Sequence, residues 1–144
     1  MTNKNYTAII SVNAAPKVAF EKIAKVDGWW AKFFSGKALN ENDTFNVKFG
    51  DTFVDFKITE AVPGKKIVWH VTDCYLSWIN NKKEWRDTQV VWELTSENGG
   101  TQIKMTHEGL VPEVECYNDC ETGWNGHVKG SLLAFINENK GQPQ

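Results

Sequence analysis

Six short segments of this chain alternate apolar and polar side chains, and one longer segment near the C-terminal end repeats its apolar residues with a helical period. A period of two is typical of a strand with one buried face, and clean alternation favours antiparallel pairing. The alternating segments are residues 6–12, 45–49, 54–58, 67–71, 90–94 and 103–107. We therefore expect about six antiparallel strands, with tight turns such as Asn98-Gly99-Gly100 between them.

Helical patterns flank this run of strands. Ala15-Pro16 opens a short helix that Gly28 ends, and the aromatic residues at 29, 30, 33 and 34 indicate a second short helix that closes at Ser35-Gly36. Residues 113–138 carry the long helix, and its apolar stripe is Tyr117, Trp124, Val128, Leu132 and Phe135. The economical packing is an α+β fold in which a curved antiparallel sheet wraps around this helix, as one domain over residues 1–144.

Composition narrows the classes of function. Acidic and basic residues nearly balance, 18 against 16, which argues against a nucleic-acid module with a basic stripe. The chain has no apolar run of about 20 residues, so we expect no membrane span. Three cysteines without framework spacing and an N-terminus without a signal-peptide pattern favour a reduced, cytoplasmic protein.

The order of these elements, with certain residues in it, resembles the START-like (Bet v 1-like, SRPBCC, helix-grip) superfamily. More narrowly, it resembles the bacterial domains named after the activator of Hsp90 ATPase. The residues that carry the resemblance are Val12, Ala15-Pro16, Val18, Phe20-Glu21, Trp92-Glu93-Leu94, Gly99-Gly100-Thr101, Thr106-His107-Glu108-Gly109-Leu110, Gly123-Trp124 and Ser131-Leu132.

The resemblance implies a cavity between the sheet and the C-terminal helix, which in relatives often holds a small apolar molecule. It leaves the chemistry open, because such relatives include carriers, receptors and cyclase domains. The aromatic residues of the chain, 7 Trp, 8 Phe and 3 Tyr, fit either a solid core or the lining of such a cavity. The residues expected to contact a small hydrophobic ligand are Trp30, Phe45, Phe56, Trp69, Trp92, Met105, His107, Tyr117, Glu121, Trp124 and Val128.

Two ionisable residues in this set are candidates for acid and base. Glu121 falls within the apolar stripe of the helix, and His107 is in phase with the inward residues of its strand. Together they could move protons in a cyclase- or dehydratase-like enzyme, or hold the polar end of a ligand. The alternative is that Glu121 reaches solvent and that His107 is a satisfied strand-end histidine.

No cofactor or metal site is expected. Cys116, Cys120 and His127 share one side of the helix, but their spacing matches no common zinc pattern. Phosphate-binding loops, dinucleotide fingerprints and the usual serine or zinc hydrolase motifs are absent from the sequence.

A separate aromatic group lies between residues 74 and 86. Tyr75, Trp78 and Trp85 flank a polar tip, Asn80 to Lys83, in what reads as a long β-hairpin. It could be a solvated hairpin, a flap over the cavity mouth, or a contact in a homodimer, because its rings exceed what a bare hairpin can bury. A chaperone-linked interaction module that uses these rings is a further alternative.

Overall fold

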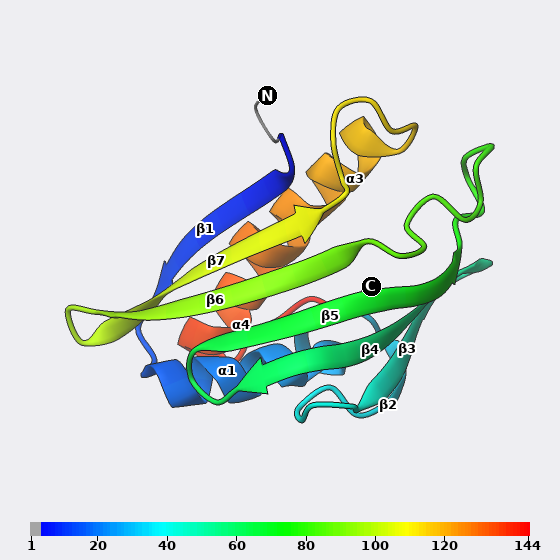
Figure 1. The fold of residues 1–144 in the computed structure, drawn as a ribbon. Helices are drawn as coiled ribbons and strands as arrows, with labels where there is room; N and C mark the ends of the chain where they lie inside the picture. Colours follow the sequence, from blue (N-terminus) through cyan, green and yellow to red (C-terminus); the bar gives the residue numbers. More distant parts are fainter. Residues whose placement is uncertain (1–3) are drawn as a thin grey trace.

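One antiparallel sheet of seven strands forms the body of the protein (Figure 1). The structure, a computed structural model, describes residues 4–144. The strands are β1 (Tyr6–Val12), β2 (Phe33–Gly36), β3 (Thr44–Phe49), β4 (Thr52–Val62), β5 (Lys66–Tyr75), β6 (Gln89–Glu97) and β7 (Gly100–Glu108). Their spatial order is β1-β7-β6-β5-β4-β3-β2, so the first strand pairs with the last. The register shifts between β4 and β5 at Asp55/Phe56 and Ile58/Glu60, and such bulges increase the bend of a sheet.

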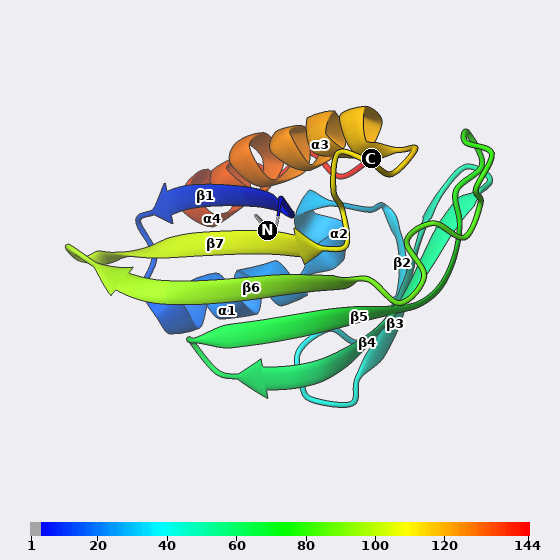
Figure 2. The ribbon, with the colours of Figure 1, turned by 45° about the horizontal axis from the view of Figure 1, so that its top comes forward.

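The helices lie against one face of this sheet (Figure 2). Two short ones, α1 (Pro16–Ala24) and α2 (Val26–Trp29), follow β1. The C-terminal helix runs through α3 (Tyr117–Trp124), a π-helical segment (Asn125–Leu132) and α4 (Leu133–Glu138). This arrangement confirms the expected α+β helix-grip fold. Within residues 4–144, every helix is too short or too polar to cross a membrane.

Three details of the expected elements were wrong. The sheet has a seventh strand, because residues 33–36 are not the end of a helix but pair with β3, Phe34 opposite Val47. The first helix ends before Lys25, and Gly28 lies inside α2, where a Cβ would come 2.5 Å from the ring of Phe135. Regular helix begins at Tyr117 instead of residue 113, after a series of turns.

Large aromatic side chains fill the space between the sheet and the helices. Trp29, Trp69 and Trp92 are fully buried, and their ring centroids lie 5.3 to 6.5 Å apart. Phe45 and Phe56 stack at 4.8 Å beside them. Fully burying one large apolar side chain stabilises a fold by about 1.5–3 kcal/mol, so this cluster is a main source of stability.

The π-helical segment keeps the helix in contact with the sheet. Trp124, Val128 and Leu132, spaced four apart, are all at most 2% exposed. In an α-helix each four-residue step drifts by about 40° around the axis. The wider π turn, with its i→i+5 bonds, drifts in the opposite sense and so offsets the drift of the α-helical turns on either side.

Candidate functional site

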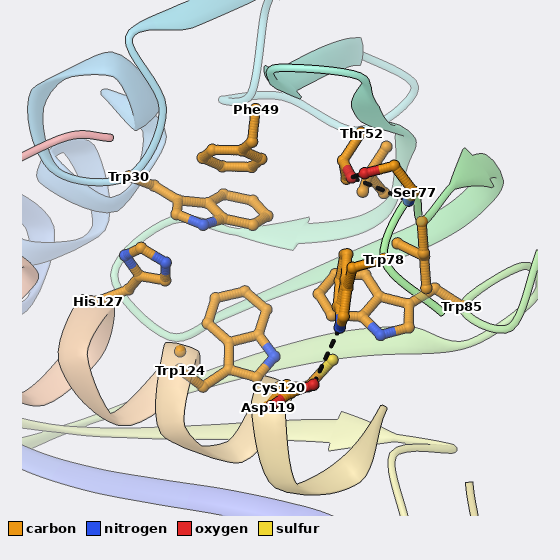
Figure 3. Close-up of a pocket in the computed structure, with 13 residues that line it drawn as sticks. Trp30, Phe49, Thr52, Ser77, Trp78, Trp85, Asp119, Cys120, Trp124 and His127 are labelled. Carbon is orange, nitrogen blue, oxygen red and sulfur yellow. Dashed lines mark hydrogen bonds between the residues drawn. The ribbon is translucent and has the colours of Figure 1, made fainter. Parts of the chain in front are cut away.

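A cavity of about 350 Å³ lies between the turn that joins β3 to β4, helix α3, and residues 76–88, which connect β5 to β6 (Figure 3). We call residues 76–88 the covering segment. The residues around the cavity are largely apolar or aromatic and come from five parts of the chain. They are Trp30, Phe49, Thr52, Val54, Leu76, Ser77, Trp78, Trp85, Asp119, Cys120, Gly123, Trp124 and His127.

Trp124 is the central ring of this wall. Its centroid lies 5.0 Å from that of Trp30 and 5.9 Å from that of Trp85, to which its plane is nearly parallel. Phe49 in turn packs on Trp30 at 5.7 Å. The C-terminal tail supports Trp30 from behind, because the backbone N–H of Gln144 donates to the Trp30 carbonyl at 2.9 Å. The wall is thus made of rings held by several separate elements.

A buried hydrogen-bond chain fixes Trp124 and Trp85 relative to each other. Trp124 donates from Nε1 to His107 Nδ1 at 3.0 Å, and His107 Nε2 lies 2.8 Å from Thr88 Oγ1. The Thr88 hydroxyl donates its one proton to the Trp85 carbonyl at 2.6 Å, so it must accept from His107. His107 is therefore the neutral tautomer protonated on Nε2, and removal from water lowers its pKa to about 3.

Two glutamates tie the covering segment to the start of the C-terminal helix. The Glu84 carboxylate accepts from the backbone N–H groups of Glu115 and Cys116 at 2.9 and 2.8 Å. In return, the Glu115 carboxylate accepts from the N–H groups of Asn80 and Asn81 at 2.8 and 3.0 Å. These two bonds lower the pKa of Glu115, because they stabilise its charged form.

Two indole groups complete this contact. Trp78 Nε1 donates to Asp119 Oδ2 at 3.1 Å, and Trp85 Nε1 donates to Cys116 Sγ at 3.3 Å. Trp78 is 49% exposed at the rim, whereas Trp85 is 8% exposed and part of the wall. The segment is a series of turns and not the β-hairpin that the sequence suggested, because most of its backbone bonds are local, such as the Arg86 N–H to the Lys83 carbonyl.

Four residues from the predicted ligand set and the 74–86 aromatic group line the cavity. Trp30 and Trp124 belong to the predicted ligand set, and Trp78 and Trp85 to the aromatic group of the 74–86 region. Tyr75, the third ring of that group, points elsewhere and stacks on Phe53 at 6.5 Å. The remaining apolar members of the ligand set do not line this cavity and lie in the buried core: Phe45, Phe56, Trp69, Trp92, Met105 and Val128.

His107 and Glu121, the suggested acid/base pair, do not share this cavity. His107 lies behind Trp124, fully buried, with both ring nitrogens engaged. Glu121 accepts a 3.2 Å hydrogen bond from Tyr117 on the side of the helix that faces Tyr6 of β1. Burial and the nearby Glu121 charge raise the pKa of Tyr6 to about 12. Tyr117 and Glu121 thus join a polar cluster away from the cavity wall.

Sequence reasoning missed other members of the wall. Thr52 and Asp119 line the cavity, and His127, considered only as a metal ligand, lies beside Trp30 and Trp124. The three-residue step from Trp124 to His127 on one helix was the available signal. Among residues 4–144 no three His, Cys, Asp or Glu side chains gather as a metal site would require. Cys120 packs on the neighbouring thiol of Cys116, and this contact with burial raises the pKa of Cys120.

A second hollow runs along the helix next to the cavity. It is wider and more polar, and Gly123, Gly126 and Gly130 leave its floor open, with no atom within 4 Å of a Cβ built on any of them. Phe49 and His127 belong to both hollows and so lie at their boundary. Of the three glycines, only Gly123 also lines the aromatic cavity.

Solved structures with this fold come from several bacteria. The Aha1 dimer from Colwellia psychrerythraea is 21% identical over 98% of this chain and 100% of its own, with a TM-score of 0.77. Protein SSP2350 from Staphylococcus saprophyticus is 13% identical over 96% of this chain and 98% of its own, with a TM-score of 0.71. CalU16 from Micromonospora echinospora is 14% identical over 94% of this chain and 77% of its own, with a TM-score of 0.65.

These identities support the fold alone, and the family rests on the sequence. No curated protein matches the chain. Residues 19–135 match the family described as activator of Hsp90 ATPase homolog 1-like protein, which is most of the chain. The match includes β2 to β7 and the C-terminal helix up to Phe135, and with them the aromatic cavity. The chain therefore belongs to the activator of Hsp90 ATPase homolog 1-like family.

Proposed function

We propose that this protein binds a small apolar or aromatic molecule in the cavity beneath the covering segment. The observation that carries the proposal is the cavity itself, about 350 Å³ in volume and walled by Trp30, Phe49, Trp85 and Trp124. Ligand sites are typically apolar clefts of about 300–1,000 Å³ with a few polar groups. An apolar cavity of about 150 Å³ accommodates benzene, so this one suits a ligand of two or three rings.

The covering segment supports this proposal as a lid. Trp78 and Trp85 turn toward the cavity, and their indole N–H groups bond to the helix opposite, at Asp119 and Cys116. Because Trp78 and Trp85 already bond to the helix, they are less available to a partner protein. The chaperone-linked alternative requires these rings to contact such a partner. The enzyme alternative needs His107 and Glu121 at one site, and no observation favours that arrangement over ligand binding.

A neutral fluorescent probe tests the proposal. N-phenyl-1-naphthylamine should bind the wild-type protein with increased fluorescence. The variant Gly123→Leu adds a side chain to the cavity wall where the backbone has room for a Cβ. It should lose the probe and keep its fold.

Gly126→Leu is the matched control, because Gly126 has the same open surroundings and lines only the neighbouring hollow. It should bind the probe like the wild type. Equal binding by all three proteins would place the probe elsewhere and remove the support for a ligand in this cavity.

Two further expectations belong to the same proposal. The three cysteines are free and buried, which supports a reducing compartment such as the cytoplasm.

The relative from Colwellia psychrerythraea is a dimer, which supports a homodimer here, and Phe33 on the edge strand β2 is 69% exposed. Analytical ultracentrifugation at micromolar concentration decides between one and two copies.

A further inference from the structure

Most polar groups of the cavity wall already have a partner within the protein. Thr52 Oγ1 lies 2.7 Å from Ser77 Oγ and accepts from the Ser77 backbone N–H at 3.0 Å. The indole N–H groups of Trp78, Trp85 and Trp124 donate to Asp119, Cys116 and His107 respectively, as described above. A ligand in the cavity finds these groups engaged, so they offer little to fix its orientation.

Two groups of the wall have no hydrogen-bond partner among residues 4–144, and they are neighbours. They are the indole N–H of Trp30 and the imidazole of His127, whose ring centroids lie 6.2 Å apart. In Figure 3 the nitrogen of Trp30 lies on the ring edge that faces His127 and Trp124. The imidazole is surrounded by the rings of Trp30, Phe49 and Trp124, and this burial lowers the pKa of His127.

The two groups together offer a matched pair of hydrogen bonds. The Trp30 indole is a donor only, and a neutral imidazole has one donor and one acceptor nitrogen. A ligand hydroxyl can accept from Trp30 and donate to His127, and a carbonyl oxygen can accept from both. Building on the proposed function, we infer that the cavity selects an aromatic or apolar ring that carries one uncharged oxygen, held between Trp30 Nε1 and the His127 imidazole.

The charges around the cavity disfavour the ionised relatives of such a ligand. The lining contains neither Lys nor Arg, so a carboxylate would lose its hydration without gaining a cationic partner. The carboxylate among the lining residues, Asp119, is at the rim beside Trp78 and would repel a second anion. A cationic ligand could approach Asp119, but it would leave the donor of Trp30 unsatisfied.

Four probes that share a naphthalene ring separate these possibilities in calorimetric titrations. They are 2-naphthol, 2-methylnaphthalene, 2-naphthoate and 2-naphthylmethylammonium. We expect 2-naphthol to bind the wild type roughly tenfold more tightly than 2-methylnaphthalene, as one or two added hydrogen bonds predict, and more tightly than either ion. In ¹H–¹⁵N spectra, 2-naphthol but not 2-methylnaphthalene should shift the indole N–H signal of Trp30.

Two variants connect the preference to His127. His127→Phe keeps a ring and removes both nitrogens, so the preference for 2-naphthol over 2-methylnaphthalene should fall to the part that Trp30 Nε1 alone supplies. His127→Gln keeps a donor and an acceptor and should retain part of that preference.

The outcomes separate this inference from the proposed function. If 2-naphthol and 2-methylnaphthalene bind the wild type equally, the inference is wrong and the ligand cavity stands. Tighter binding of either ion would also overturn it, in favour of a charged ligand class. Binding of none of the four probes would overturn the inference and the proposed function together.

Discussion

Two fully buried tryptophans differ in whether the indole N–H has a hydrogen-bond partner, so their replacement compares a satisfied with an unsatisfied indole. Trp29 and Trp69 are both 0% exposed, but Trp29 Nε1 donates to the Ile23 carbonyl at 3.1 Å, whereas Trp69 Nε1 has no partner among the described residues. Replacement by Phe removes similar volume at both sites. Only at Trp29 does it also remove a satisfied buried bond.

We therefore expect Trp29→Phe to lower the free energy of unfolding by about 1–2 kcal/mol more than Trp69→Phe does. Urea denaturation of the two variants and the wild type measures the difference. Equal losses would mean that the indole N–H of Trp69 is satisfied in solution, for example by water or by a neighbouring ring.

His107 makes the stability of the protein depend on pH. Its folded pKa of about 3 lies below the unfolded value of about 6.5, so only the unfolded chain takes up a proton between these values. Stability from this group is complete above pH 6.5 and is lost as the pH falls toward 3. At pH 5 the loss amounts to about 2 kcal/mol, at 1.36 kcal/mol per pH unit.

Urea denaturation between pH 7 and 5 should show this loss in the wild type. The His107→Leu variant should be less stable at pH 7, because Trp124 and Thr88 lose their partner, but its stability should fall by about 2 kcal/mol less on acidification. Ile103→Val, a buried change in β7 that removes no ionisable group, is the control and should keep the wild-type slope. An unchanged slope in His107→Leu would contradict the assignment.

At the scale of elements, the covering segment is held by carboxylates and not by apolar packing alone. Glu115→Gln leaves one oxygen to accept from Asn80 and Asn81, and it removes the negative charge. We expect the backbone amides of Asn80 and Asn81 to exchange hydrogen roughly tenfold faster than in the wild type. We also expect N-phenyl-1-naphthylamine to enter and leave the cavity more quickly.

Exchange measured by NMR, together with stopped-flow probe binding, tests this expectation. Glu113→Gln removes a charge from the same stretch at an exposed residue that has no hydrogen bond in the described structure, so it is the matched control. If both variants behave like the wild type, the Glu115 contacts do not hold the segment closed.

The elements themselves were largely predictable, because their patterns are local. Alternation along residues 103–107 is enough to put Ile103 and Met105 on the covered face, and the structure confirms it. The strand at 33–36 was missed because four residues are too few for a period, and its pairing with β3 is a long-range contact. The π-helical segment was missed for a related reason, since only packing against the sheet selects it.

The location of the cavity could not be predicted in the same way. Any inward ring was a candidate wall residue, and Trp69 and Trp30 look alike in the sequence. Their roles differ because Trp29, Trp69 and Trp92 fill the space under the middle of the sheet, whereas Trp30 lies at the edge of that cluster and packs on Trp124 in the cavity wall. This distinction depends on how the side chains fill the space between the sheet and the helices. The spacing of residues along the sequence does not determine it.

For the whole molecule, the division between a filled core and a cavity predicts two regions of different local stability. The strands around Trp69 and Trp92 pack on a solid core, whereas the covering segment and α3 enclose a cavity. The bonds of Glu84, Glu115 and the indole groups of Trp78 and Trp85 hold the segment to the start of the C-terminal helix. Local opening is easiest where few buried apolar contacts must be broken. Amides of the covering segment should therefore exchange faster than those of β5, β6 and β7.

A ligand in the cavity should reduce this difference. Saturation with 2-naphthol at about 100 times its dissociation constant should slow exchange in the covering segment and α3 by up to about a hundredfold, because these openings expose the site. Amides between β1 and β7 that exchange through local fraying should change little, which supplies an internal control within the same spectra. Uniform protection across the sheet would instead mean that the cavity opens only when the whole protein unfolds, and the two regions would then be a single cooperative unit.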